Sequence, residues 1–208
     1  MADATFIIQA FVTLFLIVDP IGVIPIFLGL MDKFSEEKRA KIVWKATVIA
    51  CLVLLLFSAF GKMIFGFFGI SMYSFRIAGG ILLLIISIEM LFGSKTRTEV
   101  SEDILKEQQE DMAISPMAVP LLTGPGAITS GIMLSNSAPT PTDKGILGLI
   151  ILLVFAITYV LLRNSNIVYK ALGPTGTKVV VRLMGLILSA IAIQFIIAGV
   201  REAFPAIA

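Results

Sequence analysis

The chain has 208 residues, of which 58% are hydrophobic and only 14% are charged, and its formal net charge is +2. This composition excludes a soluble globular domain of this size and predicts an integral membrane protein. The small net charge, without a basic patch interleaved with aromatics, argues against nucleic acid as a partner.

The residue types that most often carry metal, haem or thiol chemistry are nearly missing. Histidine is absent, and Cys51 is the only cysteine. Most transition-metal sites, haem ligation, a Ser-His-Asp triad and paired-thiol chemistry need residues that this chain lacks. We therefore expect no cofactor, no metal and no enzymatic activity.

Six apolar windows long enough to cross a bilayer follow one another along the chain. They cover residues 5–30, 42–65, 74–93, 112–134, 145–163 and 179–200. The stretch 94–111 is the only clearly soluble one, and we expect it to be a charged cytoplasmic loop. The predicted fold class is an all-α polytopic membrane protein with six transmembrane helices.

The first predicted span is interrupted by Asp19-Pro20 and again by Pro25. In a helix that begins with the first span, Asp19 lies roughly 20 Å from the start. This depth is near the middle of a hydrocarbon core about 30 Å thick. Backbone that leaves a helix at this depth must face protein or a water-filled cavity. We therefore predict that Asp19, Pro20, Ile21, Gly22 and Pro25 line a substrate site.

Two interpretations of Asp19 stay open. Asp-Pro is a common helix start, so Asp19 could serve only as the N-cap of the second half-helix, with Pro20 at its first position. A carboxylate within the membrane is also costly and usually functional, which makes Asp19 a candidate for ion coupling. Glu89, near the end of the third predicted span, is a second coupling candidate, with an interfacial carboxylate as its alternative.

The fourth predicted span carries the second break, at Thr123, Gly124, Pro125 and Gly126. A half-helix that starts at such a break offers backbone N–H groups suited to a carboxylate, and the half-helix before it offers carbonyls suited to an ammonium group. A zwitterionic amino acid has both charges. We predict that these four residues form a second arm of the site, and that Gln194 in the sixth span lines the same cavity.

The two halves of the chain resemble each other. Arg76 pairs with Arg182 at an offset of 106 residues, and Pro20 pairs with Pro125 at an offset of 105. A three-helix unit crosses the membrane an odd number of times, so its second copy is inverted. The expected organisation is one transmembrane domain, 1–208, made of a first repeat 1–93, the loop 94–111 and a second repeat 112–208, with the first and fourth helices broken near the midplane.

The distribution of basic residues predicts the orientation. Twelve of the 16 Lys and Arg residues flank the first, third and fifth connections between spans. Basic residues accumulate on the cytoplasmic side of membrane proteins. We therefore expect a multi-pass protein of the cell membrane with both termini outside the cytoplasm.

Three motifs resemble those of a known family. Residues 19–27 (DPIGVIPIF), 76–82 (RIAGGIL) and 120–128 (PLLTGPGAI) are similar, in this order, to the first-, third- and fourth-helix motifs of the MarC family of bacterial and archaeal membrane proteins. The resemblance extends over essentially the whole chain. It implies a small polytopic transporter, and one branch of that family moves small neutral amino acids such as glycine and alanine, driven by the electrochemical gradient of an ion such as the proton.

These observations lead to a functional hypothesis. The chain is expected to be a secondary transporter, of the symporter type, for small neutral amino acids, working by alternating access around the two breaks. H⁺ or Na⁺ is the coupling ion, the lipid bilayer is the other partner, and assembly into a homo-oligomer stays open. The alternative is an exporter or facilitator of another small solute, including drug efflux.

Overall fold

The computed structural model describes residues 4–31, 34–92, 122–138 and 140–204, and all regular structure in these ranges is helical. The helices are α1 (Ala4–Val18), α2 (Val23–Met31), α3 (Glu36–Phe68), α4 (Met72–Phe92), α6 (Pro125–Ser137), α7 (Pro141–Arg163) and α8 (Ser165–Ala203). The all-α prediction is confirmed for this part of the chain. The predicted loop 94–111 and the start of the predicted fourth span, 112–121, lie outside the described residues.

Five helical stretches within the described residues are long and apolar enough to cross a membrane. They are Ala4–Pro25, Glu36–Gly61, Met72–Phe92, Pro141–Arg163 and Ser165–Ala203. Helix α6, with 13 residues, is the described part of the predicted fourth span and is too short to cross a bilayer alone. Five candidate spans are therefore established, and the sixth stays a prediction.

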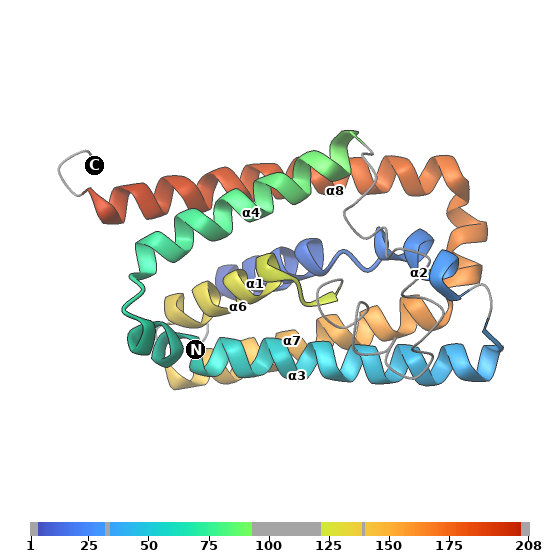
Figure 1. Ribbon diagram of the computed structural model, residues 1–208, viewed down its shortest axis with the longest axis horizontal. Helices are drawn as coiled ribbons and strands as arrows, with labels where there is room; N and C mark the ends of the chain where they lie inside the picture. Colours follow the sequence, from blue (N-terminus) through green and yellow to red (C-terminus); the bar gives the residue numbers. More distant parts are fainter. Residues whose placement is uncertain (1–3, 32–33, 93–121, 139, 205–208) are drawn as a thin grey trace.

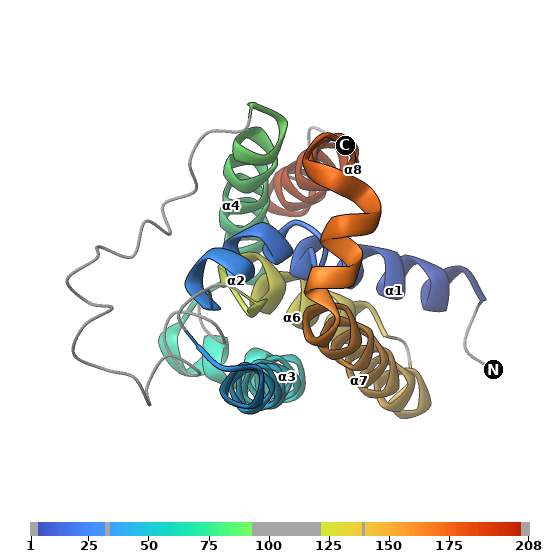
Figure 2. The ribbon, with the colours of Figure 1, turned by 90° about the vertical axis from the view of Figure 1, so that its right-hand side faces the viewer.

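The helices are arranged in three layers (Figures 1 and 2). Helices α4 and α8 lie side by side in one outer layer, α3 and α7 form the other, and α1, α2 and α6 lie between them. The core contains Leu14 and Val18 of α1 together with Val154 and Phe155 of α7, all almost completely buried. The central layer is thus shielded on both sides, and it contains the helices that flank the two predicted breaks.

Glycines allow α4 and α8 to approach each other closely. A Cβ at Gly80 of α4 would lie 2.9 Å from the carbonyl oxygen of Ala192, and a Cβ at Gly185 of α8 would lie 3.1 Å from a carbonyl oxygen of α4. An ion pair of 2.9 Å joins Arg76, near the start of α4, to Glu202, near the end of α8. The two helices therefore run antiparallel, and their small residues permit backbone contact of the kind common in membrane helix pairs.

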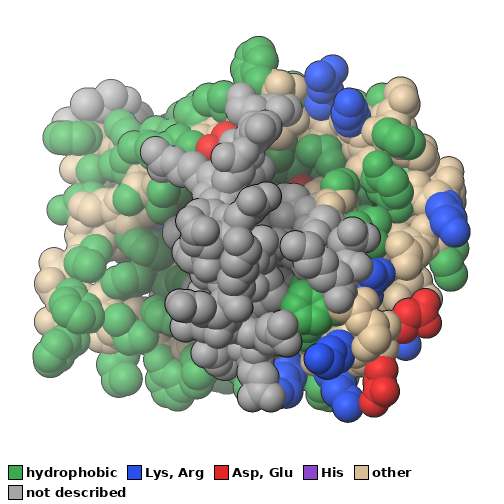
Figure 3. Space-filling model, turned by 45° about the vertical axis from the view of Figure 1, so that its right-hand side comes forward, with side chains coloured by type: hydrophobic (Ala, Val, Ile, Leu, Met, Phe, Trp, Pro, Cys, Tyr) green, Lys and Arg blue, Asp and Glu red, His purple; other side chains and the backbone are tan. Residues whose placement is uncertain are grey.

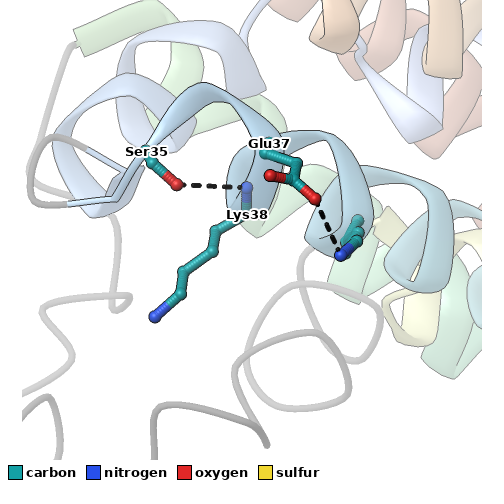
Figure 4. Close-up of polar contacts among 4 residues, drawn as sticks. Ser35, Glu37 and Lys38 are labelled. Atoms are coloured by element: carbon teal, nitrogen blue, oxygen red, sulfur yellow. Dashed lines mark hydrogen bonds and ion pairs between the residues drawn. The ribbon is translucent and has the colours of Figure 1, made fainter.

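Helix α3 begins at a side-chain cap (Figure 4). The Lys38 N–H donates to the Ser35 hydroxyl at 3.4 Å, and one turn later Glu37 and Lys41 form an ion pair of 3.1 Å. A serine cap followed by acidic residues satisfies free N–H groups and suits the positive end of the helix dipole. These residues explain why the helix starts before residue 42, where the apolar window begins.

Helix α8 changes direction at Gly173. Its backbone is left-handed there, with φ of 65°, and Pro174 follows. Glycine adopts this conformation at little cost, and proline cannot continue the hydrogen-bond ladder. The segment before the kink crosses from the end of α7 to the layer of α4, and the rest runs along α4 (Figures 1 and 2). The predicted sixth span, from residue 179, did not include this crossing segment.

Exposed basic residues gather at one end of the bundle, where α3 begins, α7 ends and α8 begins (Figures 1 and 3). The exposed Lys and Arg side chains there, from the start of α3, the end of α7 and the first half of α8, are Lys38, Lys41, Lys45, Arg163, Lys170, Lys178 and Arg182. Hydrophobic side chains dominate the other part of the same view (Figure 3). Helix α1 begins and α8 ends at the end of the bundle away from this basic cluster (Figure 1).

Candidate functional site

Residues 19–22 separate α1 from α2. Asp19 has φ of 45°, the only positive φ outside glycine among the described residues. This left-handed conformation costs least for Gly, Asn and Asp. The Asp19 N–H donates to the Phe15 carbonyl at 3.0 Å, and the Val23 N–H donates to the Asp19 carbonyl at 3.1 Å, so the turn is tight and bonded at both ends.

The Asp19 carboxylate turns back onto the start of α2. Its Oδ1 accepts a hydrogen bond from the Gly22 N–H at 3.0 Å, which is the geometry of a helix cap. A Cβ at Gly22 would overlap this carboxylate, so the turn needs glycine at that position. The other carboxylate oxygen has no hydrogen-bond partner within the part of the chain that the structure describes. Asp19 therefore caps α2 through one oxygen only.

Helix α6 begins at Pro125, within the second predicted break. Gly124 is its N-cap and offers no side chain to cap the helix, and Pro125 is its first residue. The first N–H groups of a helix have no acceptor within it, so those of Gly126 and Ala127 point out of the start of α6. This end of a helix attracts negative charge, and a carboxylate is a suitable ligand for it.

The turn at residues 19–22 and the start of α6 lie next to each other. A Cβ at Gly126 would lie 3.6 Å from Cγ2 of Ile17, two residues before Asp19, and 2.6 Å from Cδ2 of Leu83 on α4. In Figure 1 the end of α1 and the start of α6 both lie near the middle of the long axis of the bundle. The carbonyl end of one helix and the amide end of another are thus brought to the same place.

Thr123 attaches the second break to α3. It is completely buried, and its hydroxyl donates to the Ala50 carbonyl at 2.8 Å. Three further hydroxyls, of Thr47 and Ser58 on α3 and Ser130 on α6, are buried with no hydrogen-bond partner among the described residues. Buried polar groups normally have partners, often water. Their only signal in the sequence is a hydroxyl within an apolar window, and none of the three is among the predicted site residues.

The remaining predicted site residues have different surroundings. Pro20 is buried, Ile21 is half-buried, and Pro25 is exposed on α2. Gln194 is exposed on α8, and Glu89 is half-buried near the end of α4. The two breaks supply the residues that the structure brings together, whereas the side chains of Pro25 and Gln194 face outward.

The polar groups at this place are a carboxylate, hydroxyls and the free ends of helices. No three His, Cys, Asp or Glu side chains of the described ranges are close enough to hold a metal ion. Cys51 is a free cysteine, buried on α3 next to the acceptor of Thr123. The end of α1 carries a partial negative charge and the start of α6 carries a partial positive charge. The Asp19 carboxylate lies beside them.

Comparisons with known proteins give one consistent result. The family model described as MarC family integral membrane protein matches residues 4–204 of this chain. The UPF0056 membrane protein MJ1677 of Methanocaldococcus jannaschii is 39% identical over 202 residues, which are 97% of this chain and 98% of the relative. The UPF0056 membrane protein YvbG of Bacillus subtilis is 33% identical over 204 residues, 97% of each chain. No solved structure matches the chain.

Proposed function

The chain belongs to the MarC family of integral membrane proteins, and from this premise we propose that it is a secondary transporter of small neutral amino acids of the glycine and alanine type. It is a multi-pass protein, and its substrate binds between the break at residues 19–22 and the start of α6. Transport is driven by a proton gradient, with a sodium gradient as the other possibility for the coupling ion. Neither a cofactor nor bond chemistry is needed for this activity.

The observation that carries the proposal is that the end of α1 lies next to the start of α6. The carbonyl end of α1 suits an ammonium group, and the free N–H groups at Gly126 and Ala127 suit a carboxylate. An α-amino acid has these two groups on one carbon. Gly126 packs closely against Ile17 and Leu83, and such tight packing favours a substrate with a small side chain. Glycine and alanine fit these requirements.

Asp19 supplies the coupling in this mechanism. Its one uncapped oxygen can accept a proton or face the substrate ammonium group, because the other oxygen is held by Gly22. A carboxylate that changes its protonation state inside the bundle changes the charge of the site, and this links substrate binding to the gradient. Glu89 of α4 is the second candidate for this role.

The proposed architecture has two inverted three-helix repeats around this site, with the breaks near the bilayer midplane. The antiparallel α4 and α8, which carry the paired residues Arg76 and Arg182, support an inverted relation between the repeats. The basic cluster of exposed Lys and Arg at one end supports a cytoplasmic position for that end in the cell membrane, with both termini on the opposite side. Alternating access then opens the site to each side in turn.

Uptake by proteoliposomes tests the function. Purified protein reconstituted into vesicles is expected to accumulate labelled glycine faster under an imposed pH gradient than without one, and protein-free vesicles give the background. A sodium gradient in place of the pH gradient identifies the coupling ion. Glycine and alanine uptake no higher than background, with insertion verified in both orientations, would leave the exporter or facilitator of another small solute as the better description.

A further inference from the structure

A small pocket lies at the basic end of the bundle, where α2, α3, α7 and α8 meet. One side of it is apolar and contains Phe27, Val43 and Leu162. The other side contains the side chains of Arg39 and Arg163. None of the residues in the two breaks lines this pocket, so it is distinct from the substrate site proposed above.

The polar side of the pocket has an excess of positive charge. Arg39 is held in place because its Nε donates to the Phe34 carbonyl at 2.9 Å. Arg163 is exposed in the last turn of α7. Glu36 is the one acidic residue among those that line the pocket. Two guanidinium groups against one carboxylate favour an anionic ligand, and guanidinium groups are well suited to bidentate binding of phosphate oxygens.

The start of α8 lies in the same pocket and has no side-chain cap. The Asn164 side chain at the cap position donates to the Val160 carbonyl at 2.8 Å and so does not reach the N–H groups of α8. Ser165 and Asn166, the first residues of the helix, line the pocket. Their N–H groups are among those that a helix cannot satisfy internally, and such groups bind phosphate readily.

Ser165 gives an independent indication of a ligand. Its side chain is only 4% exposed, yet its hydroxyl forms no hydrogen bond within the described ranges. The Ser165 oxygen is not enclosed by protein, because the residue lines the pocket, so water or a bound molecule there can be its hydrogen-bond partner. A ligand with several acceptor oxygens would satisfy the Ser165 hydroxyl and the free N–H groups together.

We propose that this pocket binds a phosphate group through Arg39, Arg163, Ser165 and the free N–H groups at the start of α8. The pocket lies at the basic end of a membrane-spanning bundle, where the headgroups of anionic lipids lie, so an anionic phospholipid headgroup is the preferred source of that phosphate. The bound headgroup links α2 and α3 to the junction of α7 and α8, at the end of the bundle that carries the basic cluster.

Ligand-dependent thermal stability of the purified full-length protein tests this site. The probes are short-chain phosphatidylglycerol, inorganic phosphate, and a diacylglycerol of the same chain length that lacks phosphate. Phosphatidylglycerol is expected to raise the unfolding temperature in a saturable way, and diacylglycerol is not. Saturable stabilisation by inorganic phosphate alone would keep the phosphate site and assign it to a soluble ligand.

Two matched variants separate the pocket from general surface charge. Arg163→Gln removes a pocket charge, and Lys178→Gln removes another exposed charge, on α8 outside the pocket. Arg163→Gln combined with Ser165→Ala is expected to weaken phosphatidylglycerol binding by about tenfold or more, because charge-assisted hydrogen bonds are lost. Lys178→Gln is expected to leave it unchanged. Equal weakening by both changes, or stabilisation by none of the phosphate probes, would overturn the proposal.

Discussion

Asp19→Asn is expected to abolish proton-driven glycine uptake while leaving the protein folded. Asparagine tolerates the left-handed backbone at this position, and its amide oxygen can still accept the hydrogen bond from Gly22. The substitution therefore removes the charge and the protonation site but keeps the cap. Loss of a charge-assisted contact to the substrate lowers affinity by about 10- to 100-fold, and loss of the protonation site uncouples what remains.

The measurement is initial glycine uptake with and without a pH gradient, at matched amounts of reconstituted protein. Asp19→Gly is the informative companion, because glycine accepts the backbone conformation but removes both the charge and the cap. Unfolding midpoints in detergent should fall for Asp19→Gly and not for Asp19→Asn. Undiminished gradient-driven uptake by Asp19→Asn would reduce Asp19 to a helix cap.

Gly22→Ala is expected to reduce transport strongly although it leaves every charge in place. The added Cβ would overlap the Asp19 carboxylate, which must then rotate away and release the Gly22 N–H. Loss of the cap costs about 1 kcal/mol of stability. The carboxylate is displaced from its position in the turn at residues 19–22, so uptake is expected to fall by about tenfold or more.

Gly145→Ala is the matched control for that change. Gly145 lies in α7 with no atom within 4 Å of its ideal Cβ position, and alanine favours a helix more than glycine does. Its uptake and its unfolding midpoint should equal or exceed those of the natural protein. Full uptake by Gly22→Ala, measured beside this control, would show that the position of the Asp19 carboxylate does not matter for transport.

Much of the fold could be predicted from local sequence. Window length and apolar composition located the spans, because a bilayer core of about 30 Å requires long apolar helices. Gly124-Pro125 marked the place where α6 begins, and Asp19-Pro20 marked the turn that ends α1, because proline fits the first turn of a helix and disrupts its interior. The Gly173-Pro174 pair is an equally local signal, and the kink in α8 could have been predicted from it.

Contacts between distant residues could not be predicted in the same way. The bond from Thr123 to the Ala50 carbonyl joins residues 73 positions apart, and the contact between Gly126 and Ile17 depends on how α1 and α6 pack. No spacing in the sequence specifies either one. These contacts decide which polar groups meet, and therefore which predicted site residues belong together.

The exposure of Gln194 could have been predicted from the spacing of small residues in α8. Gly185, Ala192 and Gly199 recur at seven-residue intervals and are buried on one face of α8. Gln194 follows Ala192 by two positions, which places it on the other side of a helix with 3.6 residues per turn. Its exposure follows from that register, and its polarity alone had suggested a place inside the bundle.

Protection of single cysteines by substrate tests most directly whether the two breaks form one site. Cys51→Ala removes the only native cysteine, and Ile21→Cys or Gly124→Cys then places one thiol at either break. The measurement is the rate of labelling by a small thiol reagent in proteoliposomes, with and without glycine, for variants that retain uptake. Glu37→Cys, at the exposed start of α3, is the control position.

Glycine is expected to slow labelling at both Ile21→Cys and Gly124→Cys and to leave the rate at Glu37→Cys unchanged. Such a result would place the substrate between the turn at residues 19–22 and the start of α6. Unchanged labelling rates at both breaks, in protein that transports glycine, would contradict a substrate site formed by these two segments.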